Sequence, residues 1–189
     1  EWQQANVNIS LNSEQIISAK LLLACDGANS VCRQMANIAT TTKPYEQCAL
    51  ITNVKMTKAH HYRAYERFTE SGPIAMLPLH DGSDESKRCS LVWTLTPEQA
   101  ERINSLSEPA FKTELELAFG SWLGAVEQVG SRVVYPLNLV RAKQQVYHRM
   151  ALVGNASHAI HPIAGQGFNL GLRDVEQLSV AIKQALAKK

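Results

Sequence analysis

Two short apolar runs in the chain show no alternation between apolar and polar residues. Residues 21–25 and 150–153 are apolar throughout, which is typical of strands covered on both faces, as in a parallel sheet. Each run leads directly into a turn-forming segment, which begins with Asp26-Gly27 after the first run and with Gly154 after the second. We therefore predict that the two strands are neighbours and that their carboxyl ends lead into one ligand cleft.

The segment between these runs predicts an antiparallel sheet with helices on it. Strand-like runs separated by turn-forming residues cover residues 48–56, 62–69, 74–79, 88–95 and 131–139. Helices are predicted to begin at Pro97 and Pro109, because proline is favoured in the first helical turn. The expected fold class is α/β with mixed α+β character, in which residues 1–44 and 140–189 form one domain and residues 45–139 form an inserted sheet domain.

A long helix is predicted near the carboxyl end of the chain. Its apolar side chains recur at helical spacing and form one stripe, made by Phe168, Leu172, Val175, Leu178, Ile182 and Leu186. A short helix is predicted over residues 31–36. Ser30 precedes it, at the position where a side-chain oxygen accepts a hydrogen bond from the first turn.

Composition and charge narrow the classes of protein that the chain could represent. The formal net charge is only +2 and the basic residues are scattered, so nothing favours a nucleic-acid partner. The four cysteines form no CxxC pair and the histidines lack the spacing of metal ligands, so we expect buried free thiols and no metal site. The longest apolar run, residues 21–25, is far too short to cross a bilayer.

Residues 154–171 form a glycine-rich loop that leads into the long helix. Glycines before a helix expose backbone N–H groups, and the helix start adds a partial positive charge that favours an anion or an electron-rich ring edge. Gly165, Gly167 and Gly171 read GxGxxxG, but a dinucleotide phosphate loop would follow its strand more closely and precede a second strand with an acidic residue. A loop that faces a flavin fits better, and a loop that merely packs is the remaining alternative.

Two motifs flank the inserted segment. Residues 26–33 read D-G-x-x-S-x-x-R, and residues 154–174 read G-N-A-x-H-x-x-x-P-x-x-G-Q-G-x-N-x-G-x-x-D. Both resemble motifs of the single-component flavoprotein aromatic hydroxylases, the para-hydroxybenzoate hydroxylase type, most of which carry Asp at the position of Asn155. The ubiquinone-biosynthesis branch is the most similar, because of residues 66–69, 72–79 and 161–174. The Gly-Asn variant resembles the 2-polyprenyl-6-methoxyphenol hydroxylases in particular.

The resemblance implies roles for the motif residues. Asn155 would meet the ribityl or ribose hydroxyls of FAD, and residues 165–169 would lie along the pyrimidine edge of the flavin. The Pro162 carbonyl would lie near flavin C4a, where oxygen adds, which makes Pro162 the candidate catalytic residue. Asp26 and Arg33 would help to hold the pyrophosphate region and the incoming nicotinamide cofactor. The implied cofactor-binding residues are Asp26, Arg33, Gly154, Asn155, Gly165, Gln166, Gly167, Phe168 and Asn169.

The same resemblance implies a domain assignment and an activity. The outer segments would belong to a Rossmann-like FAD-binding domain, and the inserted sheet would be the substrate domain. The activity would be hydroxylation of a prenylated phenol in ubiquinone biosynthesis, with FAD, NAD(P)H and O2. The implied location is cytoplasmic with peripheral contact at the inner membrane, next to other proteins of quinone biosynthesis.

The chain begins at Glu1 without the GxGxxG segment that precedes the first motif in that family. We therefore expect the chain alone to bind FAD weakly or not at all and to be inactive. A flavin-dependent reductase of related fold and a non-catalytic assembly module remain the alternatives.

Overall fold

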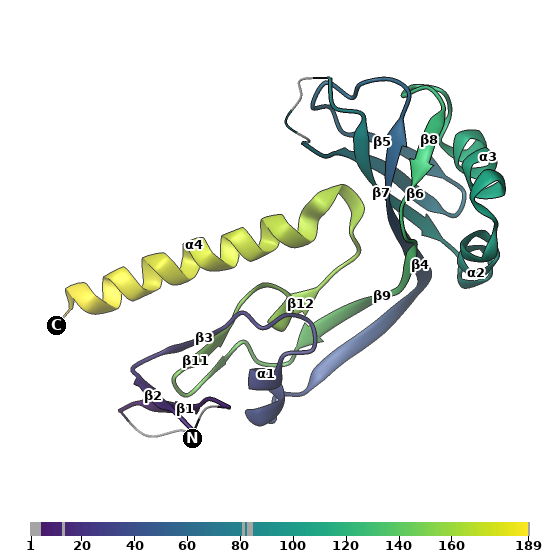
Figure 1. Cartoon of the computed structure of the whole chain (residues 1–189). Coiled ribbons are helices and arrows are strands. Elements are labelled where there is room, and N and C mark those ends of the chain that lie inside the picture. Colours follow the sequence, from purple (N-terminus) through teal and green to yellow (C-terminus); the bar gives the residue numbers. More distant parts are fainter. Residues whose placement is uncertain (1–4, 13, 81, 83–84, 189) are drawn as a thin grey trace. The chain divides into compact units, whose positions relative to one another are not determined.

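The computed structural model describes residues 5–12, 14–80, 82 and 85–188. The chain divides into two compact units: unit 1 comprises Glu1–Tyr45 and Asn138–Lys189, and unit 2 comprises Glu46–Leu137. Helices and strands occur in each unit, so the expected mixed fold class is confirmed (Figure 1). The assignment of unit 1 to flavin binding and of unit 2 to substrate binding stays a prediction.

Unit 1 contains a three-stranded sheet in which the two non-alternating runs are neighbours. β3 (Leu22–Ala24) pairs in parallel with β11 (Met150–Leu152), and β10 (Val146–Tyr147) pairs antiparallel with β11. The pairing continues past the strand ends, because the N–H of Val153 donates to the carbonyl of Ala24 at 3.0 Å. The predicted parallel pair is confirmed, and both motif segments begin at its carboxyl end.

The remaining elements of unit 1 come before or after the strands of this sheet along the chain. A hairpin of β1 (Val7–Ser10) and β2 (Ile16–Ala19) precedes β3, and α1 (Val31–Met35) follows it. After β11 come η1 (Gly154–Ala156), β12 (His158–Ala159), η2 (Ile163–Gly165) and the long helix α4 (Gln166–Ala187), coloured yellow in Figure 1. Two long strands, β4 (Thr40–Met56) and β9 (Val133–Ala142), have residues in both units.

Unit 1 buries few large side chains. Its core cluster consists of Ala24, Ala36, Ile38, Ala142, Met150, Leu152 and Ala156. β11 is buried along its length, as expected, but in β3 the side chain of Leu23 is 43% exposed, and Cys25 is exposed beyond it. The expectations that this strand is covered on both faces and that the thiols are buried are wrong here. The reason is that, among the described residues, α4 does not close over this face, and Leu23 and Cys25 line an open apolar groove of about 320 Å³ with α4.

The strands of unit 2 form antiparallel pairs. β7 (Arg88–Leu95) pairs with β4 and with β6 (Gly72–Pro78), β6 pairs with β5 (Tyr65–Thr69), and β8 (Val126–Val129) pairs with β4. Cys89, Leu91 and Trp93 of β7 are buried, and the residues between them are half-buried. This alternation places one face of the strand against the core.

Two helices pack on the sheet of unit 2, α2 (Pro97–Ser105) and α3 (Glu108–Phe119) (Figure 1). Thr96 caps α2 through reciprocal hydrogen bonds with Gln99, and Pro97 occupies the first helical turn as predicted. The core between sheet and helices is continuous. Its fully buried side chains include Leu50, Ile74, Met76, Leu91, Phe111 and Leu115.

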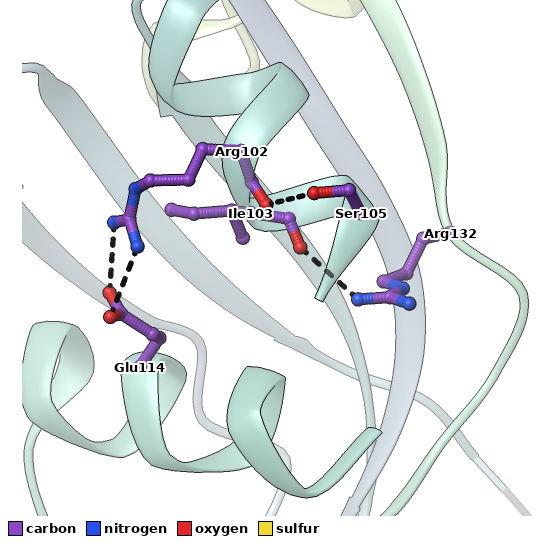
Figure 2. Close-up of polar contacts among 5 residues, drawn as sticks. All are labelled: Arg102, Ile103, Ser105, Glu114 and Arg132. Carbon is purple, nitrogen blue, oxygen red and sulfur yellow. Dashed lines mark hydrogen bonds and ion pairs between the residues drawn. The ribbon is translucent and has the colours of Figure 1, made fainter. Parts of the chain in front are cut away.

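Polar contacts connect α2 with α3 and with the chain that follows them (Figure 2). The guanidinium of Arg102 donates to both carboxylate oxygens of Glu114, at 3.2 and 3.1 Å. Arg132 donates to the carbonyls of Ile103 and Leu106, at 3.2 and 2.7 Å. Arg132 thereby adds hydrogen bonds at the carbonyl end of α2, where Ile103 also accepts the backbone N–H of Leu106 at 3.4 Å.

β5 begins at Tyr65, three residues later than expected. His61 and Tyr62 have φ angles of 47° and 57°, which strand residues do not adopt. The buried ring of His60 stabilises this turn, because its Nδ1 accepts a hydrogen bond from the backbone N–H of Tyr62 at 3.0 Å. A side-chain contact of this kind leaves no trace in the alternation of apolar residues.

Candidate functional site

The first motif forms a turn and a capped helix at the end of β3. Ser30 accepts a hydrogen bond from the backbone N–H of Arg33 at 3.0 Å, as predicted for a helix cap. The carboxylate of Asp26 accepts one from the backbone N–H of Cys32, also at 3.0 Å. Partial burial acts to raise the pKa of Asp26, but the hydrogen bonds from Cys32 and Ser30 outweigh it and hold the pKa below its ordinary value. The carboxylate therefore stays ionised at neutral pH.

Arg33 joins the first motif to the second. Its side chain is 7% exposed, and its guanidinium donates to the carbonyl of Ala156 at 2.8 Å and to that of Ala28 at 2.7 Å. The two residues bound by these N–H groups belong to the two motif segments, which are far apart in the sequence. The buried guanidinium thus lies beneath the surface that a ligand would reach, and it fixes one motif against the other.

The turn of the second motif presents Asn155 to solvent. Gly154 has a φ of 58°, which lies in the left-handed region, and the exposed Asn155 follows it in η1. The backbone N–H of Gly154 donates to the carboxylate of Asp174 on α4 at 2.8 Å. A Cβ placed on Gly171 would lie 3.6 Å from the Cα of Gly154, so α4 approaches the turn closely.

The glycine-rich loop ends in an uncapped helix start. Gly165 adopts φ 63° and ψ 22° and is the N-cap of α4, with no side-chain cap and no acidic residue in the first turn. Its N–H donates to the carbonyl of Pro162 at 3.2 Å. The expected contact residues here are exposed or half-buried: Pro162, Gly165, Gln166, Gly167, Phe168 and Asn169. The backbone N–H groups at this helix start are the kind that attract negative charge.

Two residues of the second motif that are not among the expected cofactor-binding residues make polar contacts within it. Asp174 holds Gly154, and the Nε2 atom of His158 lies 3.9 Å from the same carboxylate oxygen. His161 lies in the loop between His158 and the start of α4. Its ring packs edge-on against Tyr45 with 5.1 Å between ring centroids, and burial lowers the pKa of His161. The only sequence signal for Asp174 is its place at the end of the second motif.

The residues present fit a flavin cofactor. A Cβ placed on Gly27, Gly154 or Gly165 would meet no heavy atom within 4 Å, and all three glycines have positive φ. Their backbones are therefore open to close approach by a ligand. The uncapped start of α4 adds the partial positive charge that suits an electron-rich ring edge. A direct dinucleotide phosphate loop fits less well, because η1 and β12 separate β11 from Gly165.

Comparison with known protein families shows the family to which the chain belongs, while the role of the loop stays a prediction. The model of a family described as an FAD binding domain matches residues 2–188. The chain belongs to this FAD-binding-domain family. The match covers both units, including the segment inserted between the two motifs.

Relatives of the chain with curated descriptions include two hydroxylases named for ubiquinone or a ubiquinol. The chain is 40% identical over 173 residues to ubiquinone hydroxylase UbiL of Rhodospirillum rubrum, covering 92% of the chain and 39% of that protein. It is 37% identical over 170 residues to 3-demethoxyubiquinol 3-hydroxylase of Escherichia coli, covering 90% of the chain and 42% of that protein. The expected likeness to the ubiquinone-biosynthesis branch is confirmed. The chain spans about two-fifths of the length of these relatives.

Solved structures with the same fold include a monooxygenase and a hydroxylase in complex with FAD. The p-nitrophenol 4-monooxygenase PnpA of Pseudomonas putida superposes with a TM-score of 0.75 at 18% identity, over 100% of this chain and 47% of that one. A complex of aklavinone-11 hydroxylase with FAD and aklavinone gives a TM-score of 0.69 at 15% identity, over 96% of this chain and 34% of that one. At these identities the likeness establishes the fold alone.

Proposed function

We propose that this chain is part of an FAD-dependent monooxygenase that hydroxylates a prenylated phenol in ubiquinone biosynthesis, using NAD(P)H and O2. The observation that carries the proposal is the pair of motifs, held together by the Arg33–Ala156 hydrogen bond, in a family member that is similar to ubiquinone hydroxylases. The substrate class rests on the printed names of those relatives.

The cofactor would lie against the second motif. The amide of Asn155, exposed in the η1 turn, both donates and accepts hydrogen bonds and suits the ribityl or ribose hydroxyls. The backbone of Gly165, Gln166, Gly167, Phe168 and Asn169 would face the pyrimidine edge of the ring. Bound FAD would supply the redox chemistry, and the start of α4 would favour negative charge at the ring edge that it faces.

The other expected residues would complete the site from two sides. The ionised carboxylate of Asp26 would orient polar groups near the pyrophosphate and nicotinamide, while Arg33 would act from beneath by fixing the motifs against each other. The Pro162 carbonyl already accepts a hydrogen bond from Gly165, so its second lone pair is the one that could face flavin C4a.

Location and partners extend the proposal. No described helix is long and apolar enough to cross a membrane. A prenylated substrate would nevertheless reside in the bilayer, because its tail is apolar. On the likeness to ubiquinone hydroxylases we propose a cytoplasmic location with peripheral contact at the inner membrane, where other proteins of quinone biosynthesis would meet it.

The test is made in the organism that carries the gene. Disruption of the gene should lower ubiquinone and accumulate a prenylated phenol that lacks one hydroxyl group, measured by mass spectrometry of lipid extracts. The wild-type gene and a Glu176→Gln variant, altered at an exposed carboxylate of α4, should restore ubiquinone, while Gly165→Val should not. Unchanged ubiquinone after disruption would contradict the proposal. Flavin-dependent NAD(P)H oxidation that no phenol stimulates would favour a reductase instead.

A further inference from the structure

The carboxylate of Asp174 makes a contact that the proposed flavin site does not itself explain. It accepts the backbone N–H of Gly154 at 2.8 Å, although the two residues are twenty positions apart and lie on η1 and α4. The imidazole Nε2 of His158 is buried, has no hydrogen-bond partner in the described part of the chain, and lies 3.9 Å from the same oxygen. The carboxylate of Asp174 thus binds the residue before Asn155 and also lies next to the segment that follows the turn.

The position of Asp174 on α4 gives this contact a consequence. Gly171, one helical turn earlier on the same face, approaches Gly154 so closely that its Cβ would lie 3.6 Å from the Cα of Gly154. The helix that holds the turn also begins at Gln166, next to the loop proposed to face the ring. A single rigid helix therefore connects the Asn155 turn with the backbone N–H groups at its own start.

We propose that Asp174 is a positioning residue: it fixes the Gly154–Asn155 turn at a set distance from the start of α4, so that both meet one cofactor at once. His158 is the second polar side chain that lies beside this carboxylate. This inference rests on the proposed flavin function, and it assigns to Asp174 a role in cofactor geometry without contact to the cofactor.

The first experiment needs no cofactor. The amide hydrogen exchange of Gly154 is measured by NMR in the wild-type chain, in Asp174→Ala and Asp174→Asn, and in the control Glu176→Gln. Loss of a charge-assisted hydrogen bond should speed exchange at Gly154 by about tenfold or more in Asp174→Ala. Asp174→Asn keeps an acceptor oxygen and should be intermediate, while the control and the amides of α4 stay as in wild type. Exchange at Gly154 that is unaffected by Asp174→Ala would overturn the inference.

The second experiment separates positioning from simple stability. FAD affinity is measured by fluorescence titration for Asp174→Ala, Asn155→Ala and the double variant. If Asp174 acts through Asn155, the double variant should bind no more weakly than the weaker single variant, whereas additive losses would overturn the inference. Because the chain alone is expected to bind FAD weakly or not at all, the titration is made on the whole protein that contains it. Absence of FAD binding there would count against the proposed function, and the exchange at Gly154 alone would then decide the role of Asp174.

Discussion

The two compact units differ in how they cover their apolar side chains. Unit 2 packs aromatic and branched residues between its sheet and two helices, and several of them have no exposed surface at all. In unit 1 the core cluster is mostly alanine, and none of the described residues of α4 is buried. The helix leaves Leu172, Val175 and Leu186 exposed at 52%, 54% and 66%.

The two units are therefore held together by different kinds of contact, apolar in unit 2 and polar around the motifs of unit 1. Burial of large apolar side chains stabilises unit 2 in the usual way. In unit 1 the motif segments are fixed instead by directional polar contacts, of Arg33 with Ala156 and of Asp174 with Gly154. The expected ligand-binding residues lie on the unit with the smaller core, where backbone position is set by hydrogen bonds.

The largest expected effect compares one core residue with one helix residue. Phe111→Ala removes a fully buried ring from unit 2 and should lower the free energy of unfolding by about 3–5 kcal/mol. Leu172→Ala on α4 should cost less than about 1 kcal/mol, because that side chain is already 52% exposed. Denaturant unfolding followed by circular dichroism measures both. Equal losses would show that α4 is covered in solution and would remove the contrast between the units.

The second effect tests the polar contacts of unit 1. Arg33→Lys keeps the charge but cannot reach the carbonyls of Ala156 and Ala28 with two parallel donors, so we expect a loss of about 2–3 kcal/mol in unit 1. Arg173→Lys, at an exposed position of α4, is the matched control and should change little. Hydrogen exchange of the amides in α1 and η1 localises the effect. A wild-type exchange pattern in Arg33→Lys would mean that the motifs are held by other contacts.

Features set by residues close together in the sequence were predictable, and features set by contacts between distant segments were not. The parallel pair of β3 and β11 was predictable, because runs without alternation and their turns are local signals. The cap by Ser30 is equally local. The exposure of Leu23 was not predictable, because the apolar pattern of a strand shows which faces could be buried but not which elements cover them.

The site shows the same limit. The motif residues were identifiable by resemblance, but the carbonyl partners of Arg33 and the link from Gly154 to Asp174 join segments that only the folded chain brings together. Of the two glycines in the loop sequence Gly165-Gln166-Gly167, only Gly165 has the left-handed conformation, and Gly167 is already inside α4. Which of these two glycines is left-handed depends on where the helix begins, which sequence patterns locate only approximately.

The third effect follows from that difference between the two glycines. Gly165→Val forces a β-branched residue into the left-handed region and should cost about 1–2 kcal/mol of folding free energy as well as flavin binding. Gly167→Val should leave stability almost unchanged, because its Cβ would meet only the Ile160 side chain at 3.9 Å. It should still weaken flavin binding, since the added methyl groups would occupy the space of the ring. Melting temperature and bound flavin are compared in the two variants, and an equal loss of stability would contradict this assignment.

The smallest effect is expected in unit 2, at the ion pair between α2 and α3. Arg102 donates two hydrogen bonds to Glu114, but the side chains are 54% and 38% exposed, so water competes for both charges (Figure 2). The hydrogen bond from Arg102 lowers the pKa of Glu114, against a weaker opposing effect of burial. Because the folded-state pKa lies below the unfolded one, the stabilisation is present above the ordinary pKa of glutamate and is lost as the pH falls through the folded value. Arg102→Ala should therefore lower the melting temperature by no more than about 2 °C near neutral pH, and by less in acid or at high salt. A loss of many degrees that persists in acid would show that Arg102 stabilises α2 by packing, and the contrast between an apolar unit 2 and a polar unit 1 would then have to include this contact.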